Sequence, residues 1–180
     1  MTADEIFKPY AEIAMTCAKQ LKAIQTQIDQ ETHSAKKAIL GKQIKTIKHL
    51  IDRCIRVTGD FVPAHKSRAA QQYCEENGLG DISKVSWSHQ TKFERQKNRK
   101  ECTLIHEHKI PVSKLVEEII NAQTVDEVIH IFKNQEIVWI TKNEDKKLPR
   151  TKRPDPKQAY EGAEIHIVPN NARHGALFGI

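Results

Sequence analysis

Apolar residues recur at helical spacing through the first third of the chain. Up to residue 28 they follow one another by three, four or seven positions: Ile6, Ile13, Cys17, Leu21, Ile24 and Ile28. A polar break over residues 30–34 separates this stripe from a second one, made of Ala38, Ile39, Ile44, Ile47, Leu50, Ile51, Cys54 and Ile55. Residues three and four apart share one face of an α-helix, so the pattern predicts an N-terminal helical hairpin over residues 1–57.

Capping and alternating patterns predict shorter elements over the middle of the chain. Ser67 is placed to cap a short helix that ends at Gly78. The charged stretch over residues 89–100 is interpreted as a basic helix or an extended arm. Residues 102–110 alternate loosely between apolar and polar side chains, which predicts a strand that Pro111 ends.

Two helices and a second strand are predicted after this proline. Ser113 is expected to cap the first helix, and Thr124 and Glu127 have the capping-box spacing that opens the second. The strongest strand pattern of the chain is Glu-Ile-Val-Trp-Ile-Thr over residues 136–141. The remaining predicted elements are a short polar helix over residues 143–148, a loop over residues 150–157 and a last strand over residues 165–168.

These elements predict an α+β protein that is mostly helical. Its 180 residues are enough for a hydrophobic core, but only 38% are hydrophobic and 29% are charged, so we expect a moderate core under a strongly hydrated surface. We expect a basic helical region over residues 1–100, formed by the helical hairpin and short helices. A compact core with a basic C-terminal loop should occupy residues 101–180.

Cysteine usage and the absence of long apolar runs indicate the cellular compartment of the protein. The four cysteines include no Cys-x-x-Cys pair, which argues against a zinc ribbon. Cys17 and Cys54 fall on the apolar stripes and are predicted to be small buried hydrophobes. No stretch approaches the roughly 20 apolar residues that span a bilayer, and the N-terminus does not resemble a signal peptide. A cytoplasmic protein is therefore expected.

Basic residues give the chain a formal net charge of +6. Such a surface favours polyanionic partners, because every phosphate that it neutralises releases condensed counterions. Lysines and arginines gather on the second predicted helix: Lys36, Lys37, Lys42, Lys45, Lys48, Arg53 and Arg56. Two interpretations stay open for this helix, an ordinary solvated face and a phosphate-contacting one.

The residues best suited to chemistry lie at the end of the first long strand, in His106-Glu107-His108-Lys109-Ile110-Pro111. A neutral imidazole can take a proton near neutral pH, and carboxylates suit hard cations such as Mg²⁺ or Mn²⁺. Alternation along a strand places His106 and His108 on one face and Glu107 on the other, unless the strand is distorted at its end. The alternative interpretation is that these are surface or structural histidines.

Two segments resemble the HNH (His-Me finger) family of nucleases, whose fold is two strands and a helix around one divalent metal. Glu107-His108-Lys109-Ile110-Pro111 is similar to the first half of the family motif, and Ile140-Thr141-Lys142-Asn143-Glu144-Asp145 is similar to the second. The resemblance implies a small ββα-metal core. In it His108 is the general base, Glu107 and Asp145 hold Mg²⁺ or Mn²⁺, and His106 and Asn143 support the site. The rest of the chain, including its ending over residues 172–180, also resembles small phage or prophage proteins.

By this resemblance the protein is a metal-dependent endonuclease that hydrolyses phosphodiester bonds in DNA or, as a second choice, in RNA. Basic residues after the second half of the motif would contact phosphates on either side of the cut: Lys142, Lys146, Lys147, Arg150, Lys152 and Arg153. The alternative interpretation of this run is a flexible charged loop.

Other functions are compatible with the same sequence. Asp145 stands where the family usually has His or Asn, so the chain is alternatively a non-catalytic nucleic-acid-binding or inhibitor protein with a decayed HNH core. A third hypothesis is an interaction module, in which the N-terminal hairpin binds an acidic protein partner or forms a homodimer. Trp139 is expected in the core. For Trp87 two interpretations stay open, a surface aromatic that takes part in binding and a tryptophan without a functional role.

Overall fold

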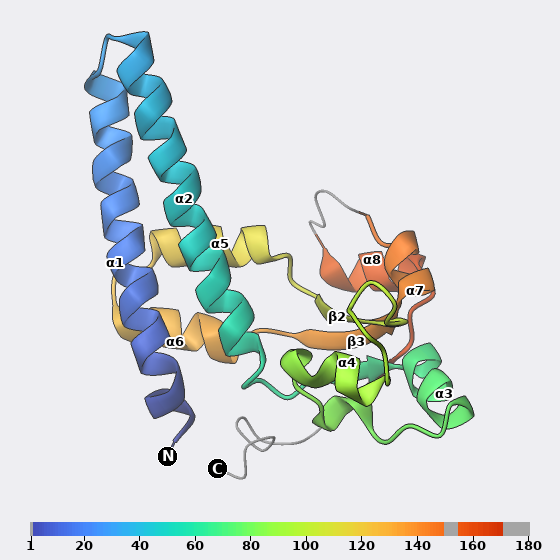
Figure 1. The fold of residues 1–180 in the computed structure, drawn as a ribbon. Coiled ribbons are helices and arrows are strands. Elements are labelled where there is room, and N and C mark those ends of the chain that lie inside the picture. The colour runs from blue at the N-terminus through green and yellow to red at the C-terminus, as the bar shows by residue number, and fades with distance from the viewer. Residues whose placement is uncertain (1, 150–154, 171–180) are drawn as a thin grey trace. The chain divides into compact units, whose positions relative to one another are not determined.

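The chain divides into two units by its internal contacts. The computed structural model describes residues 2–149 and 155–170 (Figure 1). One unit comprises residues 1–59 and 112–134, and the other comprises residues 60–111 and 135–180. The sequence predicted a single boundary near residue 100, whereas each unit is built from two separate stretches of chain. The α+β class dominated by helix is confirmed. No helix within the described residues is long and apolar enough to cross a membrane.

Four helices make up the first unit. The long helices α1 (Ala3–Gln30) and α2 (Ser34–Gly59) lie side by side in opposite directions (Figure 1). In this view α5 (Val112–Asn121) and α6 (Val125–Lys133) cross behind the half of the pair that holds the start of α1. There the rings of Phe7 and Phe132 pack with 6.3 Å between their centroids. The core of this unit therefore lies between α5, α6 and one half of the long helices.

The starts of α5 and α6 show how far capping patterns predict helix boundaries. The Thr124 hydroxyl accepts a hydrogen bond from the Glu127 backbone N–H at 3.2 Å and caps α6, as the sequence predicted. The Glu127 carboxylate accepts its own bond from the backbone N–H of Gln123, at 2.9 Å. α5 begins at Val112, just before the Ser113 that was expected to cap it.

The buried faces of α1 and α2 agree only in part with the predicted stripes. The sequence placed Ile13, Ile39 and Leu50 on buried stripes, but their side chains are 52%, 58% and 47% exposed. Small and aromatic residues contribute much of the buried surface of α1, namely Phe7, Ala11, Ala14 and Ala18. The long helices therefore bury one apolar face and leave further apolar side chains on another.

A four-stranded sheet forms the centre of the second unit. Its strand order is β2 (Leu104–His108), β3 (Ile137–Thr141), β1 (His65–Ser67) and β4 (Ile167–Val168). β3 runs antiparallel to β2 and parallel to β1, and β4 runs antiparallel to β1. Neighbours on both sides and burial on both faces account for the apolar run in β3. The sequence did not predict β1, because three residues are too few to show an alternation.

Short helices surround this sheet. They are α3 (Arg68–Glu76), α4 (Gln90–Phe93), α7 (Lys142–Lys147), α8 (Pro156–Gly162) and the 3-10 turns η1 (Ile82–Lys84) and η2 (Trp87–His89). Ser67 caps α3 as predicted, since its hydroxyl accepts from the Ala70 N–H at 2.9 Å. The predicted loop over residues 150–157 is wrong at its end. Asp155 caps α8 and Pro156 occupies the first helical position, where its missing N–H breaks no helical bond.

One face of the sheet carries an apolar cluster of the second unit. Val138 and Ile140 of β3 pack with Leu148, which follows α7, and with residues in and after α8, namely Tyr160, Ala163 and Ile165. Trp139 points to the other face and is fully buried, so its predicted place in the core is confirmed.

Candidate functional site

The two halves of the predicted HNH motif lie on neighbouring strands. In the antiparallel register of β2 and β3, His106 is paired with Trp139 and Glu107 is paired with Val138. The pairing continues without a bulge to His108, the last residue of β2, so the alternation of side chains is kept. His106 and His108 therefore lie on one face of the sheet, and Glu107 lies on the other.

The two histidines belong to an aromatic patch on their face of the sheet. The His106 ring meets the buried Trp139 ring edge to face, with 4.7 Å between the centroids. The centroid of the His108 ring is 6.3 Å from that of His106. His108 is only 6% exposed, and His106 is half-buried. The predicted general base is thus packed into the sheet and faces away from Glu107.

Glu107 faces the side of the sheet that α7 covers. Its partner Val138 belongs to the apolar cluster that contains Leu148. Asp145 lies one turn before Leu148 on α7 and is half-buried, while Asn143 on the same helix is exposed. In the described part of the chain, no three His, Cys, Asp or Glu side chains are grouped so that they could hold one metal ion. The register places His108 and Glu107 on opposite faces of the sheet.

A polar network fixes α7 at the end of β3. The Thr141 hydroxyl accepts from the Glu144 N–H at 3.2 Å, and the Glu144 carboxylate accepts from the Thr141 N–H at 2.8 Å. The same carboxylate accepts from the Ser67 hydroxyl at 2.8 Å. Glu144 is 8% exposed, so this residue of the second half of the motif anchors α7 on β1 and β3.

Of the six residues predicted to contact phosphates, three belong to the part of the chain that the structure describes. Lys142 is half-buried, and its ammonium donates to the backbone carbonyl of Lys100 at 2.6 Å. Lys146 and Lys147 are exposed on the last turn of α7, and Lys147 lies 4.0 Å from the carboxylate of Glu164. Arg150, Lys152 and Arg153 lie outside the described residues.

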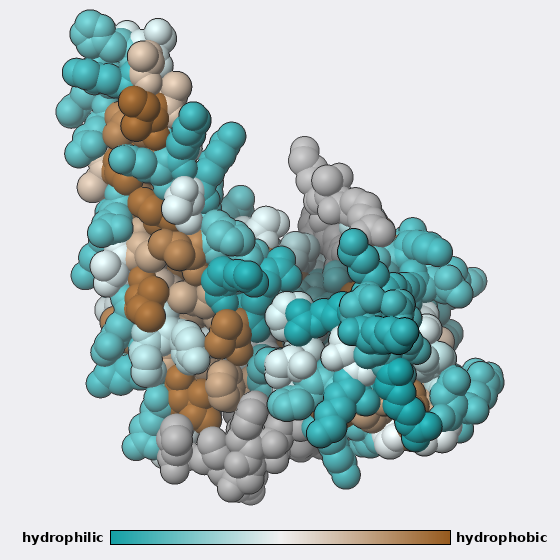
Figure 2. All heavy atoms as spheres, in the orientation of Figure 1, coloured by the Kyte–Doolittle hydropathy of each residue, from teal (hydrophilic) through white to brown (hydrophobic). Residues whose placement is uncertain are grey.

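A second group of basic side chains lies on the segment that runs from the last residue of η1 toward β2, which we call the basic segment (residues 84–100). All six of its lysines and arginines are exposed: Lys84, Lys92, Arg95, Lys97, Arg99 and Lys100. Its acidic residue, Glu94, is buried and accepts from the backbone N–H groups of Thr103 and Leu104, at 2.6 and 3.2 Å. Figure 2 shows strongly hydrophilic side chains over the chain between α4 and β2. The density of basic residues is visible in the sequence, but the predicted site did not include them.

Within the basic segment an arginine lies on a tryptophan. The guanidinium carbon of Arg99 is 3.4 Å from the centroid of the half-buried Trp87 ring. The backbone N–H of Trp87 donates to the Asp60 carboxylate at 2.7 Å. Burial raises the pKa of Asp60, against the lowering by this hydrogen bond and by the charge of Arg99. The hydrogen bond to Asp60 thus fixes the backbone of Trp87, and the exposed guanidinium of Arg99 lies on its ring.

A lysine of α7, Lys142, joins the basic segment at the residue that follows this arginine. The charges of Lys142 and Arg99 both act on the thiol of Cys102, where they lower its pKa against the larger rise caused by burial. Lys142 is also bonded to the carbonyl of Lys100. We therefore define the basic surface of the second unit as Lys97, Arg99, Lys100 and Lys142.

Comparisons with protein-family models, with curated proteins and with solved structures found no match to this chain. The resemblance to HNH nucleases therefore rests on the residues quoted above alone.

Proposed function

We propose that the protein binds nucleic acid through the basic surface of its second unit. The observation that carries the proposal is the exposed guanidinium of Arg99 stacked on Trp87, with the exposed Lys97 and Lys100 in the same segment and Lys142 bonded to the Lys100 carbonyl. Lysines and arginines bind phosphates of any sequence, because they release condensed counterions. A planar guanidinium held on an indole has one face committed to the ring and the other available to an unpaired base. The arrangement thus suits a single strand better than a closed duplex.

Cleavage of the bound strand is the second candidate function. Its support is the chain order β2, β3, α7, which is the order of strand, strand and helix that the HNH resemblance implies. Glu107 and the helix that carries Asp145 also lie on one side of the sheet. His108 faces the opposite side, so we rank metal-dependent hydrolysis by this triad below binding.

Binding is tested with the full chain and a fluorescein-labelled single-stranded DNA of about 20 nucleotides. Anisotropy titrations over a series of KCl concentrations should show an affinity that falls steeply with salt. Three or four phosphate contacts on a single strand correspond to a slope of about −2 to −3 in log K against log salt. A duplex of the same length should bind more weakly. No binding at low salt, or a slope near zero, overturns the proposal.

Cleavage is tested separately on supercoiled plasmid with Mg²⁺ or Mn²⁺. The binding proposal expects salt-sensitive retention of the plasmid without nicking. Nicking that disappears in His108→Ala, with an unchanged circular dichroism spectrum, supports the nuclease instead. Nicking that persists in this variant cannot come from the proposed general base and excludes that mechanism.

A further inference from the structure

Exposed apolar side chains concentrate on the long helices of the first unit. Among the described residues, the large hydrophobic side chains that are exposed are Ile13 of α1 and Ile39, Leu50 and Val57 of α2. Figure 2 shows apolar surface that follows the length of this helix pair on the side toward the viewer. In Figure 1, in the same orientation, α5 and α6 lie behind the pair. The apolar surface is therefore on the side of α1 and α2 that faces away from α5 and α6.

Helical geometry aligns these residues in two facing lines. Leu50 follows Ile39 by eleven positions and Val57 follows Leu50 by seven, so the three lie on one side of α2. On α1 the same spacings connect Ile13 with Gln20 and Ile24. Gln20 and Ile24 line a hollow of about 470 Å³ together with Ile39, Gln43 and Thr46. Gln20 and Ile24 of the line on α1 and Ile39 of the line on α2 thus form opposite walls of one hollow.

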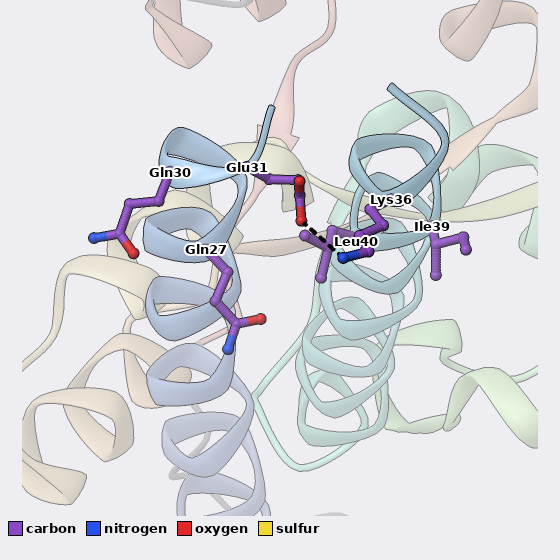
Figure 3. Close-up of a pocket in the computed structure, with 6 residues that line it drawn as sticks. All are labelled: Gln27, Gln30, Glu31, Lys36, Ile39 and Leu40. Atoms are coloured by element: carbon purple, nitrogen blue, oxygen red, sulfur yellow. Dashed lines mark ion pairs between the residues drawn. The ribbon is translucent and has the colours of Figure 1, made fainter. Parts of the chain in front are cut away.

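A second hollow lies toward the connection between the two helices. It has a volume of about 440 Å³ and is lined by residues of both helix ends, as Figure 3 shows: Gln27, Gln30, Glu31, Lys36, Ile39 and Leu40. Ile39 lines both hollows, so they adjoin. Here the Lys36 ammonium lies 3.8 Å from the Glu31 carboxylate. We call these two hollows, together with the exposed apolar residues Ile13 and Leu50 that continue the two lines, the α1–α2 groove.

The wall formed by α2 is strongly basic. α2 holds seven lysines and arginines, all exposed, and Asp52 is its one acidic residue, so its formal charge of +6 equals that of the whole chain. Arg56 pairs with Asp52 and Lys36 pairs with Glu31. The other five have no ion-pair partner among the residues described. Two of them, Lys42 and Arg53, are eleven positions apart and run beside the apolar line, and Lys42 also lines the larger hollow.

We propose that the α1–α2 groove binds an acidic amphipathic helix of a partner protein. An apolar groove between two antiparallel helices accepts a third helix, whose apolar side chains at every third or fourth position enter the groove. Asp or Glu residues that flank such a seam would lie over Lys42 and Arg53 and neutralise them. The partner thus supplies apolar side chains that cover those of the groove, and negative charge that neutralises the lysine and arginine beside it.

The same features disfavour other occupants. A second copy of this chain would bring another helix of charge +6 to the groove, and like charges oppose such an assembly. Nucleic acid neutralises the lysines but offers no row of apolar side chains to Ile13, Ile39 and Leu50. A lipid surface is flat, whereas the apolar residues here line a groove.

The test uses the full chain and a labelled synthetic peptide of about three heptads, with Leu at the a and d positions and Glu at the flanking ones. The matched control peptide carries Lys in place of every Glu. Ile39→Gln with Leu50→Gln removes the apolar line at exposed positions, where substitutions affect folding little. Lys42→Gln borders the groove, and Lys45→Gln, on the outer side of the same helix, is its matched control.

The acidic peptide should bind, and the basic peptide should not. We expect the double variant to weaken binding about tenfold, as the loss of two apolar contacts implies. Lys42→Gln should weaken it several-fold more than Lys45→Gln does. No binding at about 100 µM protein, or equal binding to the double variant, overturns the proposal. Two other outcomes also overturn the proposal if the peptide does not bind. One is self-association of the chain in sedimentation that depends on Ile39 and Leu50, and the other is retention on phosphatidylserine vesicles that depends on the same two residues.

Discussion

The hydroxyl of Ser67 donates a 2.8 Å hydrogen bond to the carboxylate of Glu144, a residue 77 positions away in the chain. Ser67 ends β1 and caps α3, and Glu144 closes the capping box of α7. One buried pair therefore connects two helix starts and two adjacent strands. Since the carboxylate also accepts from the Thr141 backbone N–H, its removal would leave buried donors without an acceptor.

Replacing Glu144 should therefore destabilise the fold. Glu144→Ala is expected to lower the free energy of unfolding by about 2–4 kcal/mol, because unsatisfied buried donors cost about 1–3 kcal/mol each. Glu144→Gln keeps one oxygen acceptor and should lose less than half of that. Urea denaturation measures both, and Glu161→Ala, at an exposed position of α8, serves as the control with a change below about 0.5 kcal/mol. Equal stability of Glu144→Ala and Glu161→Ala would contradict the structural role.

Arg99 offers a way to separate charge from stacking in nucleic-acid binding. Arg99→Lys keeps the charge but loses the planar group on Trp87, so it should weaken single-strand binding and leave the salt slope unchanged. Arg99→Ala should weaken binding further and reduce the slope by about 0.7. The exposed Lys157 of α8 is the matched control, and Lys157→Ala should change neither quantity. If Arg99→Lys binds like the wild type, the stack has no part in recognition.

Much of the fold could be predicted from local patterns, because those patterns report local physics. β3 is apolar from Ile137 to Ile140 because it is buried on both faces, and the caps of α3 and α6 depend on one hydroxyl each. Burial on α1 could not be predicted in the same way. Ile13 has the right spacing but is exposed, while Ala11 and Ala14 are buried. Which side of an apolar helix is covered depends on α5 and α6, which come almost 100 residues later in the chain.

The candidate site shows a similar limit. The alternation of His106, Glu107 and His108 predicted opposite faces unless the strand end was distorted, and the regular register of β2 keeps them apart. The sequence offers no signal that Trp87 and Arg99 stack, since they are twelve residues apart in a segment of turns. The five basic residues between positions 92 and 100 were the available signal, and three of them, Lys97, Arg99 and Lys100, belong to the basic surface.

The four cysteines should react slowly while the protein is folded. All are buried and free, and burial raises the pKa of each, for Cys74 to about 11. The reactive species is the thiolate, so both access and ionisation are restricted near pH 8. A thiol-specific chromogenic disulfide should label the native protein far more slowly than the urea-unfolded chain, in which all four react at once. Fast labelling of a native cysteine would show that the part of the fold that covers it opens readily.

His65 should make the protein less stable in mild acid. Its Nδ1 accepts a hydrogen bond from the Asn170 backbone N–H at 2.8 Å, which requires a neutral ring. Burial lowers the pKa of His65 in the folded state, and the charge of Lys109 adds to this, against the opposite effect of Glu136.

The sign of the pH dependence follows from proton binding. In the unfolded chain a histidine takes up its proton near pH 6.5, whereas in the folded state His65 does so at a lower pH. Between those two values the unfolded state binds more protons, so the free energy of unfolding falls as the pH drops below about 6.5. His65→Asn keeps an acceptor near the position of Nδ1 but does not titrate, and it should flatten this part of the curve. Urea midpoints at a series of pH values on either side of this point measure the slope, with the exposed His33→Asn expected to behave like the wild type. A variant at His65 that keeps the full acid sensitivity would assign the effect to another group.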